Sequence, residues 1–381
     1  MTAGDAPQSK PLRRVSAQGL FFPAAAAYAA VAVPLSVYTL FHPMAWLPGF
    51  ATSAGHAQEL LFGFALAVVA GFLINRVRRS TVGLLFVLWL GARVAFLTAP
   101  GSVVSSVLNV GFAALLLGIV VPPFLRAAKK WRNQAIAPIL LTIGLALLVF
   151  HGAATLGVPV FEYRALHVAV LALALLMLFM GGRAIAPAAA GHVRRMGGNL
   201  GSCVQPGLEG AQLLLVAFAA LIVSWPPARP LAGLALFAAA AVSLVRLLRW
   251  RFWLYLDRLD LTCLGIGYVW LVVGLVLLGA AYSIAQPALQ VAVHAITVGA
   301  LGTLTITMMA RTRMIGTRRA PDRPPGLLVA VVAVAIAAVL RLGWPYDPTV
   351  LLAAALVFSL AYWVLFFSLL AMARSPAGAS D

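Results

Sequence analysis

Residues 349–372 read TVLLAAALVFSLAYWVLFFSLLAM, and this stretch contains no charged residue. About 20 apolar residues in an α-helix are enough to cross the hydrocarbon core of a bilayer. The stretch therefore predicts a membrane-spanning helix, and similar apolar runs recur along the rest of the chain.

The composition of the whole chain agrees with this interpretation. Of its 381 residues, 63% are hydrophobic and 9% are charged, whereas ordinary soluble domains are about 25% charged. Helices pair their backbone donors and acceptors within each segment, as lipid requires. We therefore expect an all-α, polytopic membrane bundle of about twelve helices. The predicted spans are 20–41, 58–75, 81–98, 103–124, 136–156, 165–182, 208–225, 231–248, 260–282, 287–310, 326–343 and 349–372.

The positions of the basic residues predict the orientation of these spans. If residues 1–19 form a cytoplasmic tail, alternation of the spans puts all but four of the 27 Lys and Arg on the cytoplasmic side. Such a bias is typical of multi-pass proteins. It predicts a transmembrane domain over 20–372 and a second cytoplasmic tail over 373–381. Because the charges lie in short loops between apolar runs, the formal net charge of +18 does not indicate nucleic-acid binding.

A weak internal repeat is one interpretation of the span pattern. The second, sixth and tenth spans each carry a histidine near the outer end and an arginine on the inner side, which would suit three four-helix units. Similar lipid-facing composition is the alternative explanation.

Five of the six histidines map to the outer half of the membrane: His42, His56, His151, His167 and His294. Ionisable residues within membrane spans are candidates for function. Each one alone has a simpler interpretation, as a neutral imidazole bonded to a nearby carbonyl. His294 is the deepest, at roughly 10 Å inside its span for a rise of 1.5 Å per residue.

His56 and Glu59 are separated by three residues and share a helical face. Such a pair can bind metal in a helical bundle, although Glu59 could instead stabilise the first turn of its helix. Arg93, near the outer end of the third span, has three interpretations. It could pair with Glu59, hold an anionic group such as a haem propionate, or extend to the membrane surface.

Several stretches resemble one family of bacterial membrane proteins, the NnrS family, over most of the chain. They include HAQELLFG at 56–63, WLGAR at 89–93, WRN at 131–133, GGRAIAP at 181–187, RLLRWR at 246–251, GYVWL at 267–271 and HAITVGA at 294–300. The resemblance implies a twelve-span protein of the bacterial inner membrane that binds haem and copper and takes part in the nitric oxide response. By position, His56, His151 and His294 match family histidines, Glu59 the family glutamate, and Arg93 and Arg183 family arginines.

The chain also departs from the family pattern. Gln58 stands where the family has a second histidine after His56, and two further family histidines are replaced around Leu264–Tyr268 and Ile315–Arg319. Either His56, His151 and His294 are the ligands, or part of the metal loading has been lost. Imidazole suits both haem iron and copper.

These observations predict a membrane protein that binds haem, and copper as a second candidate, and that relieves nitric oxide stress. His56, His151, His294 and Arg93 are the predicted cofactor-binding residues, and His56, Glu59 and His294 the predicted metal ligands. No nucleotide-binding or zinc-hydrolase motif is present, so no catalytic residue is assigned. The alternatives are a secondary transporter of a small solute without bound metal, and a scaffold or sensor.

Overall fold

The computed structural model describes residues 14–127, 131–201, 204–283 and 289–374. Most of the two predicted tails lies outside these ranges. The described elements are β1 (Arg14–Val15), α1 (Gln18–Phe41), η1 (Pro48–Phe50), α2 (Ser53–Gln58), η2 (Glu59–Phe64), α3 (Ala65–Leu73), β2 (Val77–Arg78), α4 (Arg79–Thr98), α5 (Val103–Ala127), α6 (Trp131–Gln134), α7 (Ile136–Leu156), α8 (Pro159–Arg195), α9 (Pro206–Ile222), η3 (Pro226–Ala228), α10 (Arg229–Trp250), η4 (Phe252–Tyr255), α11 (Leu259–Ser283), α12 (Leu289–His294), η6 (Ala295–Ala300), α13 (Leu301–Gly316), α14 (Leu327–Gly343) and α15 (Pro348–Arg374).

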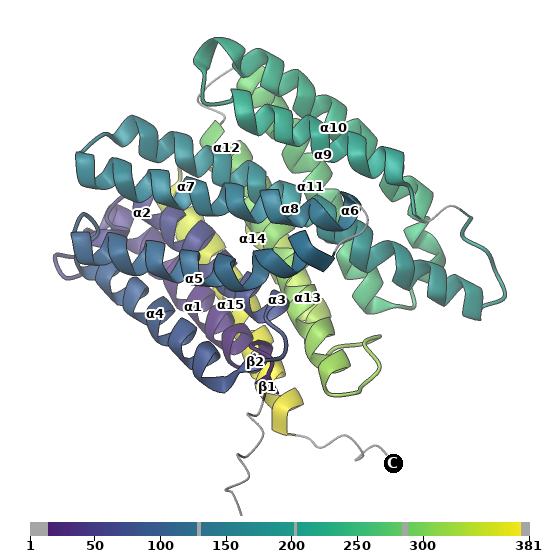
Figure 1. The fold of residues 1–381 in the computed structure, drawn as a ribbon. Helices are drawn as coiled ribbons and strands as arrows, with labels where there is room; N and C mark the ends of the chain where they lie inside the picture. The colour runs from purple at the N-terminus through teal and green to yellow at the C-terminus, as the bar shows by residue number, and fades with distance from the viewer. Residues whose placement is uncertain (1–13, 128–130, 202–203, 284–288, 375–381) are drawn as a thin grey trace, which may run out of the picture.

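The predicted all-α membrane bundle is confirmed (Figure 1). Within the described ranges, ten helices are long and apolar enough to cross a membrane, and α9 and α14 are shorter apolar helices at the seventh and eleventh predicted spans. Each of the twelve predicted spans therefore coincides with a helix. The two short strands β1 and β2 pair antiparallel and tie the segment before α1 to the connection between α3 and α4.

The largest difference from the predicted boundaries concerns the sixth span. Helix α8 has 37 residues, which is about 55 Å at 1.5 Å per residue and exceeds the thickness of a hydrocarbon core. The apolar run ends near Arg183, but the helix continues to Arg195. Charged residues can leave the hydrocarbon core and still form an α-helix in the polar surroundings beyond it.

Two spans are not α-helical throughout. The second span consists of α2, the π-helical segment η2 and α3, and the tenth consists of α12, the π-helical segment η6 and α13. Helix α8, the sixth span, has no such segment. The three-unit repeat therefore stays a prediction, although the second and tenth spans share this feature.

Small residues bring the helices into close contact. Helices α1 and α15 lie side by side, so the two ends of the described chain meet (Figure 1). Helices α10 and α11 cross at Gly233, where an added Cβ would lie 2.6 Å from the carbonyl oxygen of Gly279. Such contacts are typical of helices packed in lipid.

Large apolar side chains remain exposed on the outside of the bundle, among them Leu156, Leu221 and Phe367. Contiguous exposed apolar surface is unfavourable in water, whereas a bilayer solvates it. Together with the ten long apolar helices of the described ranges, this exposed surface identifies the chain as a multi-pass membrane protein.

Candidate metal and haem site

The outer-half residues predicted from the sequence lie at matching ends of their helices. His56 and His294 are close to the beginning of the second and tenth spans, whereas Arg93 and His151 are close to the end of the third and fifth. Because successive spans alternate in direction, these positions belong to the same end of the bundle. The structure divides them into two groups.

The first group contains His56 and His294, which lie within electrostatic range of Arg341 near the end of α14, with His294 also within range of His56. Helix α12 packs against α14, which explains how Arg341 reaches the two imidazoles. Arg341 is one of the four basic residues that alternation of the spans places on the outer side, and no sequence pattern connects it with the histidines. Its position near the outer end of a span is the one feature of the sequence that points to a location near the histidines.

Hydrogen bonds define the tautomers of both imidazoles in this group. The Ser36 hydroxyl donates its proton to the Val33 carbonyl at 2.9 Å, so at 2.7 Å it accepts from Nδ1–H of His56. His294 Nδ1 lies 2.6 Å from the Gln290 carbonyl, which can only accept. Both neutral rings therefore carry their proton on Nδ1 and have Nε2 as the basic nitrogen. This is the arrangement found in histidines that bind metals through Nε2.

The second group is a buried polar network around Glu59. Arg93 Nη1 donates to Glu59 Oε1 at 2.8 Å, and the Tyr28 hydroxyl donates to Glu59 Oε2. Arg93 Nη2 also donates to Asn109 Oδ1. Glu59 is fully buried and Arg93 is 2% exposed. The interpretation of Arg93 as a side chain that extends to the membrane surface is therefore wrong, and its pairing with Glu59 is found.

Gly63 makes room for this network. It lies one helical turn beyond Glu59, and an added Cβ would lie 2.1 Å from Arg93 Nη1. The Gly63 carbonyl accepts from Trp89 Nε1 at 2.9 Å. Both contacts join η2 to α4, the helix that carries Arg93.

His151 belongs to this second group. Its Nε2 lies 3.3 Å from Nε2 of Gln58, and the same amide donates to Asn109 Oδ1 at 3.0 Å. Because an amide nitrogen only donates, His151 Nε2 accepts and its Nδ1 carries the proton. Among the described residues that Nδ1 has no hydrogen-bond partner, although His151 is 1% exposed. Gln58 thus links His151 to the Glu59 network.

Both groups lie beside π-helical segments. Glu59 is the first residue of η2, His56 precedes it in the last turn of α2, and His294 immediately precedes η6. π-Helical turns insert an extra residue into a helix and are frequent at functional sites. They rotate the residues before the segment relative to those after it, a change that periodicity in the sequence does not reveal.

The donor set of the first group fits copper. Two imidazole nitrogens with Nε2 unprotonated suit copper, a metal for which imidazole is a good ligand. No group of three or more His, Cys, Asp or Glu side chains gathers in the described part of the chain. In this structure Glu59 is held by Arg93 and Tyr28. A metal site made of His56, Glu59 and His294 therefore stays a prediction.

The histidines also offer an axial ligand for haem. Either Nε2 atom could ligate iron, whereas the two cavities described below contain none of the histidines in their linings. Arg93, predicted to hold a propionate, has both terminal nitrogens engaged by Glu59 and Asn109.

The opposite end of the bundle holds ion pairs that sequence analysis missed. Arg246 and Arg183 lie 3.8 Å and 3.7 Å from the carboxylate of Glu209, and Arg258 and Arg311 contact Asp260. From the sequence alone, Arg246, Arg258 and Arg311 are interpreted only as determinants of orientation. Several acidic residues at the same ends of spans were the signal that they are paired.

Fold and site together define a polytopic, all-α membrane protein with an imidazole pair and a buried ion pair near one end. The model of the NnrS protein family matches residues 19–377, and the chain belongs to the NnrS family. No match is found among the curated proteins.

Proposed function

We propose that this protein binds a redox metal at the outer end of the bundle and takes part in nitric oxide metabolism or in relief of nitrosative stress. Family membership supports the role in nitric oxide metabolism. The observation that carries the metal site is the pair His56 and His294, whose Nδ1 atoms are both engaged while both Nε2 atoms are basic.

Copper is the metal that this pair favours, with the Nε2 atoms of His56 and His294 as ligands. Haem is the second cofactor in the proposal, with one of these histidines or His151 as an axial ligand. A bound copper or haem iron would supply one-electron chemistry and an affinity for nitric oxide. The residues of this chain would hold the metal, orient the imidazoles and exclude water.

The basic residues support a location in the bacterial inner membrane with both termini in the cytoplasm. His56, His151, His294 and Arg93 would then lie toward the periplasmic side. Substrates or inhibitors that enter from that side would meet the site first.

The test is the cofactor content of the full chain, purified in mild detergent after growth with ample copper and haem. We expect bound copper by elemental analysis and a Soret band if haem is retained. His56→Ala and His294→Ala should each remove the copper. His167→Ala is the matched control, because this outer-half histidine contacts the edge of the Tyr282 ring and lies outside the proposed ligand set.

Copper retained by both ligand variants, or lost equally from the His167→Ala control, would contradict the assignment. The biological part needs its own measurement. Cells that express the protein should resist a nitric oxide donor better than cells that express His294→Ala at equal abundance. Equal resistance would contradict the proposed role in nitrosative stress, but it would not contradict the assignment of the metal ligands.

A secondary transporter is the competing function, and one observation favours it. Transporters often place their binding sites at discontinuous helices, and π-helical segments disturb the regular α-helix in the second and tenth spans. Solute flux in proteoliposomes, unchanged in His56→Ala and His294→Ala, would support this alternative.

A further inference from the structure

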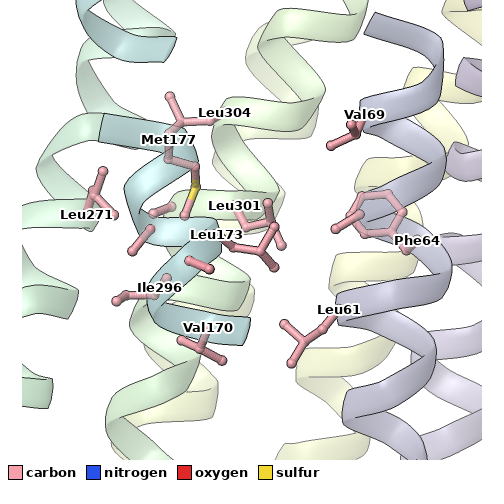
Figure 2. Close-up of a cluster of buried hydrophobic side chains, with 14 of the residues drawn as sticks. Leu61, Phe64, Val69, Val170, Leu173, Met177, Leu271, Ile296, Leu301 and Leu304 are labelled. Atoms are coloured by element: carbon pink, nitrogen blue, oxygen red, sulfur yellow. The ribbon is translucent and has the colours of Figure 1, made fainter. Parts of the chain in front are cut away.

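A narrow apolar cavity lies between α3, α8 and α13, away from the histidines. It has a volume of about 100 Å³, and its lining includes Val69, Leu173, Met177, Leu301 and Leu304. Figure 2 shows Val69 on one side of this region and Met177, Leu301 and Leu304 on the other. Nearly all of the exposed cavity surface is apolar, so it suits a hydrocarbon chain better than a polar solute.

A wider cavity of about 440 Å³ lies beside it, toward the arginine-rich end of the bundle. The two cavities share Phe72, Met180, Ala184 and Met308 in their linings. They are therefore adjacent, and the wider cavity is called the mouth below.

Two arginines line the mouth. Arg183, Arg311 and Thr312 belong to its lining, and its described lining includes no carboxylate. Glu209 and Asp260 contact these arginines from outside the lining, and Asn133 Oδ1 accepts from Arg183 Nη1 at 2.6 Å. These contacts orient the guanidinium groups and offset part of their charge, while the polar groups of the lining itself are all hydrogen-bond donors.

We propose that the two adjacent cavities together bind one anionic phospholipid from the leaflet at the arginine-rich end. An acyl chain would occupy the apolar part, and the phosphate would lie at Arg183, Arg311 and the Thr312 hydroxyl. Basic pockets between membrane helices recognise anionic lipid headgroups in this way. The proposal does not depend on the metal site, because none of its residues belongs to the histidine groups.

The experiment compares lipids on the full chain purified in mild detergent. Phosphatidylglycerol and phosphatidylcholine with matched acyl chains are added, and bound lipid is counted by native mass spectrometry. Two arginines at the headgroup should favour phosphatidylglycerol on the order of tenfold. Ala184→Trp fills the space shared by the two cavities and should abolish this preference. Leu141→Trp, on an exposed face of α7, is the control and should retain it.

The outcomes are distinguishable from those of the proposed function. Equal binding of the two lipids by the wild-type chain would overturn the inference without any variant. So would full retention of phosphatidylglycerol by Ala184→Trp, or its complete displacement by inorganic phosphate, which would assign the mouth to a free anion. Loss of haem from Ala184→Trp would instead identify the cavity as a cofactor site. His294→Ala should keep the lipid whether or not it loses copper.

Discussion

The guanidinium of Arg93 lies 2.8 Å from the carboxylate of Glu59, and both groups are buried inside the bundle. The two residues come from different spans, α4 and η2, so the ion pair ties two helices together. Removing one partner of a buried pair leaves a charge without compensation, and this is more costly than removing both.

Arg93→Leu should therefore destabilise the protein strongly, by about 3–5 kcal/mol, because Glu59 would stay buried without its cation. The double change Arg93→Leu with Glu59→Leu should recover part of the loss. Thermal unfolding in detergent measures both. The matched control is Arg126→Leu at the exposed end of α5; if it is as destabilising as Arg93→Leu, the pair does not stabilise the fold.

Gly63→Ala should also destabilise the protein, because the new Cβ would be placed 2.1 Å from Arg93 Nη1 and would displace the guanidinium. Gly111→Ala in α5 has open space around the added Cβ and should be neutral or stabilising by up to about 1 kcal/mol. Unfolding temperatures of the two variants, compared with wild type, test this. Similar behaviour of the two would show that Arg93 can move at little cost.

Ser36→Ala removes the acceptor for Nδ1–H of His56 and so the group that holds its imidazole in position. If His56 binds copper as proposed, copper affinity should fall by about 10–100-fold, the usual effect of losing such a partner. The overall fold should be preserved. A competition titration with a copper(I) chelator measures the affinity. Ser368→Ala is the control, since that hydroxyl donates to the Val364 carbonyl of its own helix, far from the histidines in the sequence and at the other end of its span; an equal effect there would count against Ser36 as a positioning residue.

Asp347 caps the amino end of α15, and its carboxylate accepts from the Thr349 hydroxyl and from the backbone N–H groups of Thr349 and Val350. These hydrogen bonds lower the pKa of Asp347 below its usual value. A carboxyl whose pKa is lower in the folded state stabilises the fold above its unfolded-state pKa and loses that contribution as the pH falls through the folded-state value.

Asp347→Asn keeps an acceptor that does not titrate. We therefore expect its unfolding temperature to fall less than that of wild type between neutral and strongly acidic pH. Scanning calorimetry in detergent at several pH values measures the difference. Parallel curves for the two chains would show that the cap does not contribute to the pH dependence.

The sequence by itself determined the membrane bundle and the ends at which its polar residues lie. Apolar runs of about 20 residues define helices because lipid leaves no other way to pair the backbone. Alternation of the spans then places His56, His151, His294 and Arg93 at one end. The family motifs were also readable from the chain alone.

Only the tertiary structure decided which of these residues meet. His56 and His294 lie near Arg341, whereas His151 joins Gln58 and the Glu59 network. Neighbours of this kind come from helices far apart in the chain, and helical periodicity carries no information about contacts between spans. The burial of Arg93 depends likewise on Glu59 and on the missing side chain at Gly63, and the extra residue of each π-helical segment turns the histidines in a direction that spacing in the sequence cannot reveal.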